Sequence, residues 1–477
     1  MIEQIEVNNI DFQELTLINH AGNKFVHLKG MQMEMTIYEN LFLDHISGTI
    51  LIAEAVDLSD ILPVIGEETL VIKFKSSGIP NRSKTNSYIF SVYKVTKREK
   101  LEERMEGYVI HFVSKENIIN LKSESTAGYV GKTIKDIVNK EYETHFLDNE
   151  DTHGKNIVKY LSVPTPIELD ETEGLHSFVG NKSNPLEFIN YLSSQAKSNT
   201  YPESDYVFYR DRIGYKFKTI SSLIDQEPVE SYYLADPNVA DSKDIVEPDP
   251  VRKYQIIYDL KHTQSPETAK RIETGIYDNE VLSIDPLTKQ FTQKTFSYYW
   301  DYTSAGFTNL SNFGIMSPYS IHETTRAPYH TRMLAVDSKK QDYTYMENKT
   351  GDNNISYPKT RQDFLNMRIV KNGLMDYSAE LEIVIPGDNL RTVGQVINIF
   401  IPVNYAHEKL KNQYNLLFTE KVGSDQITAT FLITKVVHKY NQLTKQYVTK
   451  LTCIKDSYGS SISSMEKVDK DLGDIWT

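Results

Sequence analysis

Apolar and polar residues alternate along much of the first quarter of the chain. In residues 31–38 the two kinds of position fall on opposite faces of a period-two pattern, as in a half-buried strand. The apolar face comprises Met31, Met33, Met35 and Ile37, and the polar face comprises Gln32, Glu34 and Thr36. Similar runs follow at 48–55, 69–74, 88–95 and 108–113. Because glycine and proline breaks separate them, these runs predict a small antiparallel barrel or sandwich.

The pattern changes between residues 114 and 233, where helical and strand periods mix. Residues 134–138 begin a short amphipathic helix, and a second helix over 184–192 starts with an asparagine cap followed by proline. Residues 206–217 predict a hairpin with its turn at 211–214. We therefore expect an α+β insertion in this part of the chain.

A break in composition follows the insertion. Residues 236–250 are acidic, contain three prolines and lack periodicity, which predicts a linker. Strand patterns resume at 254–260 and in the pair 281–284 and 290–296. Residues 301–358 are rich in Tyr, Asn, Thr and Ser and receive no assignment.

The N-terminal strand pattern returns near the C-terminus. Residues 379–385 alternate as residues 31–37 do, with Leu381, Ile383 and Ile385 on the apolar face. The matched residues of the last hairpin are Phe90, Lys94, Val95, Tyr108 and Val109 with Phe431, Lys435, Val436, Tyr447 and Val448. Val393–Gly394 likewise repeats Ile65–Gly66. Because these pairings occur in the same order, they favour a duplicated barrel over two unrelated β-segments.

These patterns divide the chain into consecutive segments. They are a first tube-like β-barrel (1–115), an α+β insertion domain (116–235), an acidic proline-rich linker (236–252), strands of the second barrel or its partner (253–300), an irregular or α+β insertion (301–375), a second tube-like β-barrel (376–457) and a C-terminal extension (458–477). The predicted fold class is mainly β with α+β insertions, with two duplicated tube-like antiparallel β-barrels.

Composition excludes several classes of function. The 477 residues include 52 Lys and Arg against 65 Asp and Glu, which argues against a protein whose main task is to bind nucleic-acid phosphates. The single cysteine excludes an intrachain disulfide. No apolar run reaches the roughly 18 residues of a membrane helix, and the N-terminus does not resemble a secretory signal. We therefore expect a soluble protein made in a reducing compartment.

No catalytic or cofactor motif is complete. Residues 128–133 resemble the end of a phosphate loop, but Thr126 stands where that motif requires glycine, so a capped helix start is the better interpretation. Residues 148–154 lack the ligand alternation of a calcium loop. His438 is expected to be a packed or interface residue, and Cys453 lacks the setting of a nucleophile. We therefore predict no catalytic, cofactor or metal site, and no enzyme.

Several short motifs, taken in order, resemble the central baseplate hub protein of contractile-tailed phages. The N-terminal motifs are Gly30 with the strand 31–38, then 39–41, 46–50 and 62–67. The later ones are 131–134, 184–185, the hairpin around Gly214, 385–388, 390–394 and the end at 455–457. The resemblance covers residues 6–458, with a departure at 427–430, where a Ser-Gly turn is expected. The hub family is related to the N-terminal part of type VI secretion spike proteins.

The resemblance implies a structural role without a cofactor. Hub proteins of this family are trimers whose subunits each contribute two tube-like barrels, so three copies form a pseudo-hexameric ring. That ring joins the hexameric tail tube to the trimeric spike and lets DNA pass. The implied partners are two further copies of the chain, the tail tube protein, the spike protein (in some systems with a lysozyme) and other baseplate proteins. The implied location is the virion baseplate, after synthesis in the host cytoplasm and without membrane insertion.

Two other functions remain open. A tail-associated peptidoglycan hydrolase would contain a compact helical catalytic domain. A receptor-binding or carbohydrate-binding tail protein would show a fibrous repeat or an exposed aromatic groove.

The alternation also gives candidate functional residues. Gln32, Glu34 and Thr36 in the first copy and Glu380 and Glu382 in the second are expected to point away from the cores. We expect them to line the channel, where a polar or acidic surface would repel DNA phosphates. The alternative is that they are ordinary solvent-exposed or subunit-contact positions. The apolar pair Ile475 and Trp476, in the C-terminal extension, is the candidate partner-docking segment.

Overall fold

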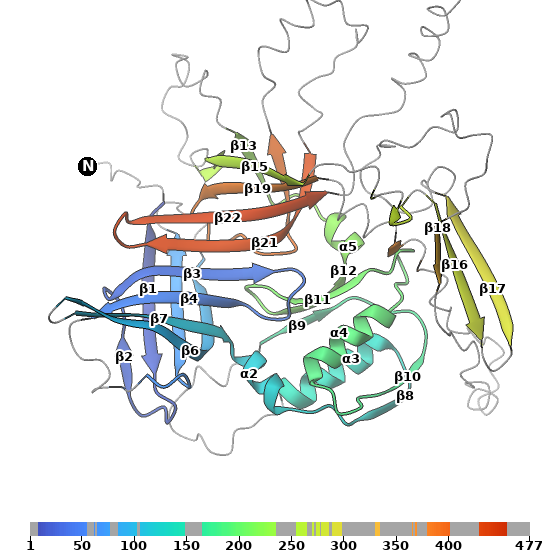
Figure 1. Cartoon of the computed structure of the whole chain (residues 1–477), viewed down its shortest axis with the longest axis horizontal. Helices are drawn as coiled ribbons and strands as arrows, with labels where there is room; N and C mark the ends of the chain where they lie inside the picture. Colours follow the sequence, from blue (N-terminus) through green and yellow to red (C-terminus); the bar gives the residue numbers. More distant parts are fainter. Residues whose placement is uncertain are drawn as a thin grey trace, which may run out of the picture.

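The chain forms two β-rich halves with a smaller α+β unit beside them (Figure 1). The computed structural model describes residues 8–54, 62, 64–76, 84–102, 105–147, 165–234, 254–264, 270, 273–276, 278–285, 289–297, 330–333, 365, 368–369, 379–400 and 429–455. The expected linker and the C-terminal extension lie outside these residues, and so does most of 301–375.

The first half contains strands β1 to β7, which surround one apolar core. They are β1 (Ile10–Ile18), β2 (Phe25–His27), β3 (Gln32–Asn40), β4 (Ser47–Glu54), β5 (Thr69–Ser76), β6 (Asn86–Glu102) and β7 (Met105–Ser114). Their order in the sheet is β3-β4-β7-β6-β5-β1-β2, with antiparallel neighbours. In Figure 1, β1 and β5 run across β3 and β4. The five strands predicted from alternation in this region are confirmed.

The second half repeats this arrangement around a core of its own. It comprises β13 (Glu230–Leu234), β14 (Ile256–Ile257), β15 (Asp259–Gln264), β19 (Ala379–Pro386), β20 (Val396–Phe400), β21 (Ala429–Asn441) and β22 (Gln446–Lys455). The order β20-β21-β22-β19-β15 corresponds to β5-β6-β7-β4-β3. As predicted, Leu381, Ile383 and Ile385 are buried in the second core.

A shared irregularity supports the duplication independently of strand order. The register of β6 on β7 shifts between Val92 and Lys94, and that of β21 on β22 shifts between Ile433 and Lys435. These bulges occupy matched positions in the two copies, because Lys94 and Lys435 are paired in the repeat. One detail of the repeat was wrong: β19 takes the place of β4, not of residues 31–37 in β3, because it pairs with β22 as β4 pairs with β7.

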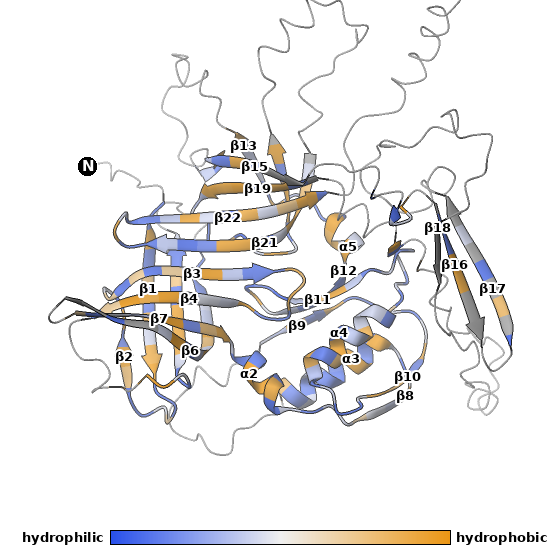
Figure 2. Ribbon diagram, viewed as in Figure 1, coloured by the Kyte–Doolittle hydropathy of each residue, from blue (hydrophilic) through white to orange (hydrophobic). Residues whose placement is uncertain are grey.

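The two halves join edge to edge into one sheet. Strand β3 pairs antiparallel with β21, from Asn40 opposite Lys435 to Glu34 opposite Asn441, which makes a continuous 14-stranded sheet. Figure 2 shows hydrophobic and hydrophilic residues alternating along β3 and β21. The outer face of the sheet therefore continues from one half to the other.

The α+β unit, called the middle unit below, covers residues 115–224. It contains α2 (Lys115–Lys122), β8 (Gly128–Lys132), α3 (Ile134–Tyr142), the π-helical turn η1 (Glu143–Leu147), β9 (Ile167–Leu169), β10 (His176–Val179), α4 (Pro185–Gln195), β11 (Tyr206–Arg210), β12 (Tyr215–Thr219) and α5 (Ile220–Ile224). Its core is formed mainly by α3, α4 and the β11–β12 hairpin. The predicted helices and hairpin are confirmed.

A small three-stranded sheet stands apart from both halves. It consists of β16 (Asp278–Asp285), β17 (Gln290–Ser297) and β18 (His330–Met333), in the order β17-β16-β18. The antiparallel pairing of β16 with β17 confirms the strand pair expected at 281–296. Among the described residues, neither strand pairs with a strand of the second half.

The fold class predicted from the sequence, mainly β with α+β insertions, is confirmed. Among the described residues, the strand pairings do not close either half into a complete ring. Each expected barrel is therefore observed as a sheet around its own core. The sheet is antiparallel in the first half and mixed in the second, where β13 pairs parallel with β14 and β20.

Candidate functional site

The outer face of the joined sheet is the first candidate surface. The strand registers place residues of both halves in rows across it. One row consists of Lys450, Val437, Tyr38, Ser47 and Val113, and the next consists of Val448, Lys439, Thr36, Thr49 and His111. This surface is polar with scattered exposed apolar side chains, of which Tyr38 is 44% exposed.

The charges on this face are paired across neighbouring strands. Glu34 accepts an ion pair from Lys439 at 3.0 Å, and Glu382 from Lys450 at 2.9 Å. Glu380 is half-buried on the same strand as Glu382. The face therefore agrees with the polar surface expected from the sequence, but lysines offset the charge of both ion-paired glutamates.

Two of the five expected outward residues are buried. The register of β3 on β4 shifts between Gln32 and Glu34, so Gln32 lies opposite the core residue Ile52 and is only 3% exposed. This bulge turns Gln32 to the core side, which alternation alone does not predict. Thr36 stays on the outer face, but it lies between Lys439 and Thr49 and is 5% exposed.

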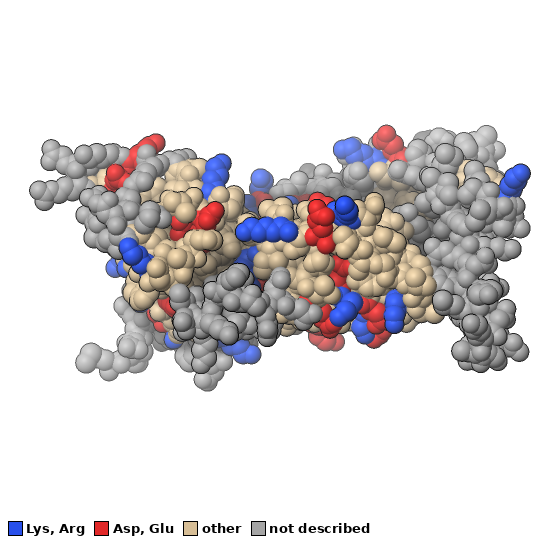
Figure 3. Space-filling view, turned by 90° about the horizontal axis from the view of Figure 1, so that it is seen from below, with Lys and Arg blue, Asp and Glu red and all other residues tan. Residues whose placement is uncertain are grey.

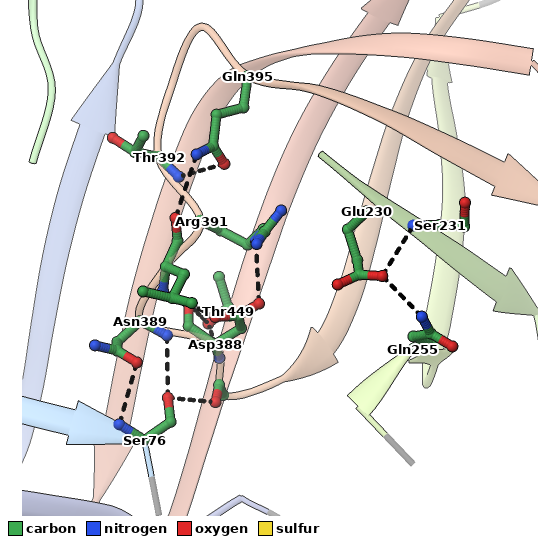
Figure 4. A network of polar contacts seen from close by, with 12 residues as sticks. Ser76, Glu230, Ser231, Gln255, Asp388, Asn389, Arg391, Thr392, Gln395 and Thr449 are labelled. Carbon is green, nitrogen blue, oxygen red and sulfur yellow. Dashed lines mark hydrogen bonds and ion pairs between the residues drawn. The ribbon is translucent and has the colours of Figure 1, made fainter. Parts of the chain in front are cut away.

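The second candidate site is a buried polar junction between the halves, formed largely by the segment 386–395. Ser76 at the end of β5 and Asn389 exchange hydrogen bonds: the Ser76 nitrogen donates to Asn389 Oδ1 at 3.2 Å, and the Asn389 nitrogen donates to Ser76 Oγ at 3.0 Å (Figure 4). Ser76 Oγ also donates to the Gly387 carbonyl, and Asn86 Nδ2 donates to the Asn389 carbonyl at 2.6 Å. The segment that carried part of the family resemblance therefore connects the two halves.

The segment 386–395 also makes hydrogen bonds within itself and to β22 of its own half. Arg391 Nε donates to Asp388 Oδ2 at 3.0 Å, and the Asp388 nitrogen donates to Thr449 Oγ1 at 3.0 Å. Burial alone would lower the pKa of Arg391, but Tyr232, Asp388 and Glu230 together raise it above its ordinary value. Gly387 leaves no room for a side chain, because a Cβ there would lie 2.0 Å from the Tyr447 ring.

Three titratable residues complete the junction, two through their side chains and Arg212 through its backbone nitrogen. Glu39 of β3 accepts from Thr392 Oγ1 at 2.5 Å, and burial raises its pKa to about 7. The Arg212 nitrogen, in the turn between β11 and β12, donates to Thr392 Oγ1 at 3.2 Å and so brings the middle unit into the network. His438 is fully buried with its Nδ1 2.9 Å from the Tyr447 hydroxyl, and burial lowers its pKa to about 3. The prediction that His438 is a packed residue is confirmed.

The positions examined for catalytic chemistry have structural roles. Thr133 caps α3, because its Oγ1 accepts from the Asp136 nitrogen at 3.1 Å, which confirms the capped helix start. Cys453 is buried, and this burial raises its pKa above the ordinary value. Among the described residues, no cluster of three His, Cys, Asp or Glu side chains could hold a metal ion. Residues 148–154 lie outside the described part.

Charges of both signs mix on the surface of the molecule seen from below. Figure 3 shows lysine and arginine side chains interspersed with aspartate and glutamate over that face. No helix of the described residues has the length and apolar character needed to cross a membrane.

The sequence reasoning missed the junction as a site. Residues 385–388 and 390–394 stand out in the sequence as motifs of the family resemblance. These motifs do not indicate that the segment contacts Ser76 and Glu39, which lie more than 300 residues earlier in the chain. The docking candidates Ile475 and Trp476 lie outside the described residues.

The fold resembles those of two solved tail proteins. A tail protein from Neisseria meningitidis aligns with a TM-score of 0.51 and 8% identity, over 93% of this chain and 96% of that one. The 43 kDa tail protein of prophage MuSo2 from Shewanella oneidensis aligns with a TM-score of 0.50 and 7% identity, over 93% and 99%. No family model and no curated protein matches the sequence. The resemblance to tail proteins is therefore confirmed at the level of the fold.

Proposed function

We propose that this chain is a structural, non-enzymatic subunit of a phage tail baseplate hub. In this proposal three copies form a pseudo-hexameric ring that joins the hexameric tail tube to the trimeric spike, and DNA passes through it. The fold likeness to tail proteins supports the class. The observation that carries the ring is the edge-to-edge joining of two equivalent halves in one sheet.

The joined edges suggest how further copies would attach. Within a chain, β3 of the first half pairs with the C-terminal part of β21 in the second half. Their counterparts in the repeat are β15 and the C-terminal part of β6. Within the described residues, β15 pairs only with β19, and β6 beyond Ser91 pairs only with β7. If the contact repeats, β15 of one copy pairs with β6 of the next, and the chain of halves closes into a ring.

The registers identify the residues that would meet. Thr36 lies opposite Lys439 within the chain. Lys261 is the counterpart of Thr36, because the matched bulges align Thr452 with His111, and the rows through these two residues reach Lys261 and Thr36 respectively. Glu99 is the counterpart of Lys439, because the residue opposite Glu99 on β7 aligns with the residue opposite Lys439 on β22. Lys261 and Glu99 of neighbouring copies should therefore lie opposite each other.

Paired cysteines test this contact. The variant with Lys261→Cys and Glu99→Cys should form covalent trimers on mild oxidation, detected on a non-reducing gel, whereas either single variant should not. The variant with Tyr38→Cys and Val437→Cys is the positive control, since its link lies within one chain. Cys453 is buried and does not interfere. If the control pair closes and the test pair gives only monomers, the ring proposal is wrong.

In this assembly the outer face of the joined sheet would line the channel. Its polar surface and paired charges would give DNA phosphates little to bind, which suits rapid passage. Glu34, Glu380 and Glu382 remain the candidate lining residues. The spike, tube and other baseplate proteins remain the proposed partners, in the virion tail.

A further inference from the structure

The carboxyl group of Glu39 lies where the two halves meet. Its side chain is buried, and its strand β3 is the one that pairs with β21. Oε2 accepts from Thr392 Oγ1 at 2.5 Å and faces the Val393 nitrogen at 3.4 Å, both from the second half. Oε1 contacts the Tyr88 hydroxyl of the first half at 3.3 Å. One carboxyl group thus connects both halves.

The charged groups around Glu39 compensate it poorly. Arg212, in the turn of the middle unit, favours the ionised form, but Asp211 in the same turn opposes it. Arg212 Nη1 contacts Asn86 Oδ1 at 3.4 Å. The remaining titratable neighbours are Tyr88, Tyr447 and His438. Burial raises the pKa of both tyrosines and lowers that of His438, so all three are neutral near pH 7.

We propose that Glu39 is a proton-dependent latch, which holds the segment 386–395 and the turn 211–214 against the first half while protonated and releases them when it ionises. The neutral acid can be buried at low cost, whereas the ionised group is a buried charge beside Asp211. Ionisation therefore favours any opening that admits water to the carboxylate. Because burial raises the pKa of Glu39 to about 7, this change falls within the neutral range.

The sign follows from proton linkage. Glu39 has a higher pKa in the closed junction than in water, so the closed state binds more protons between the two values. Closure is therefore strongest at low pH and weakens as the pH rises toward 7. A rise in the pKa of Glu39 from its ordinary value of 4.5 to about 7 predicts that the equilibrium constant for opening increases about tenfold between pH 6 and 8.5.

Amide hydrogen exchange of the full chain, read by mass spectrometry, tests the latch. The ratio of exchange rates between the natural protein and Glu39→Gln, taken at equal pH for 386–395 and 211–214, should rise about tenfold from pH 6 to 8.5. Taking the ratio removes the effect of pH on the intrinsic exchange rate and the effects of the other titrating groups, because both proteins share them. The control is Glu68→Gln, which removes another buried carboxylate. The Glu68 carboxylate lies away from the junction and accepts a hydrogen bond from the Ile65 nitrogen, with a nitrogen–oxygen distance of 2.6 Å. The exchange rate of Glu68→Gln divided by that of Glu39→Gln should rise by the same factor over this pH range.

A flat ratio would overturn the latch, as would an equal loss of the pH effect in Glu68→Gln. A second variant keeps the test decisive if Glu39→Gln folds poorly. Asp211→Asn removes the like charge that raises the pKa of Glu39, so its exchange should reach a plateau at lower pH than that of the natural protein. An unshifted plateau in Asp211→Asn would also contradict the proposal.

Discussion

Single residues at the junction connect segments that are about three hundred positions apart in the chain. Asn389 contributes its backbone nitrogen, its carbonyl and both side-chain atoms to contacts with Ser76, Lys84 and Asn86 of the first half. All but Lys84 among these residues are buried, so an unmatched group there would be costly. The alignment of the two halves therefore depends on a few polar side chains as well as on strand pairing.

Truncation of Asn389 tests this dependence. Asn389→Ala should lower the free energy of unfolding by about 2–4 kcal/mol, because it leaves Ser76 and Asn86 with buried, unmatched polar groups. Urea denaturation measures the change. Asn23→Ala is the matched control, since it removes the exposed contact with Asn19 and should change the free energy by less than about 0.5 kcal/mol. If the two substitutions lowered the free energy of unfolding equally, the buried contacts of Asn389 would stabilise the protein no more than an exposed hydrogen bond.

His438 should give a pH dependence opposite to that of Glu39. Burial lowers the pKa of His438 to about 3, below its value in the unfolded chain. The contribution of the neutral histidine to the free energy of unfolding is therefore complete above pH 6.5 and is lost as the pH falls. Between pH 6.5 and 5 the natural protein should lose about 2 kcal/mol of stability relative to His438→Gln. Urea denaturation at several pH values measures the difference. The matched control is His20→Gln, because His20 is exposed. The natural protein should lose no stability relative to this control between pH 6.5 and 5, and a loss as large as that relative to His438→Gln would contradict the role given to His438.

At the scale of elements, alternation predicted strands well because each strand buries one face. Residues 69–74 and 379–385 became β5 and β19 for this reason. Alternation could not predict the partner of a strand, which is why β19 was matched to β3 and not to β4. It also could not predict the bulge at Met33, which arises from the pairing of β3 with β4 and turns Gln32 inward. The helix α2 was not predicted, because its residues 115–122 show little amphipathic pattern.

The candidate site was less predictable than the fold. Glu34 and Glu382 were identified as outward residues, but their lysine partners come from strands far away in sequence. The motif 385–394 was noticed as a pattern, whereas its task of connecting the halves depends on Ser76, Asn86 and Glu39. Contacts of this kind follow only from tertiary structure.

The C-terminal extension has a prediction of its own. Deletion of residues 459–477 should leave the protein folded and assembled, because the last described strand of the second half ends at Lys455, before the deleted segment. We expect weaker attachment of a neighbouring baseplate protein, since the apolar pair Ile475 and Trp476 would be lost. Co-sedimentation with baseplate components measures the attachment, and Trp476→Ser is the finer variant. Unchanged attachment after the deletion would exclude the docking role.

At the scale of the whole molecule, the proposed channel can be tested through its charges. Replacing Glu34 and Glu382 together by lysine converts two ion pairs into lysine pairs on the outer face. Folding should change by no more than about 1 kcal/mol per pair, but DNA should leave reconstituted particles more slowly, because cationic side chains bind phosphates.

The control for this charge reversal is Glu14→Lys. It breaks a similar ion pair, with Lys73 at 2.6 Å, between β1 and β5, which lie several strands away from the β3–β21 seam and outside the rows that carry Glu34 and Glu382. Its DNA release should match that of the natural protein. Equal release by the natural protein and the double variant would remove Glu34 and Glu382 from the channel.

The central claim is that the chain assembles as a ring of three copies. The most direct measurement is the mass of the purified protein in solution by light scattering, from low micromolar concentration upward. We predict about 165 kDa, three times the 54.9 kDa of one chain. A mass that stays at 54.9 kDa over the whole concentration range would contradict the claim.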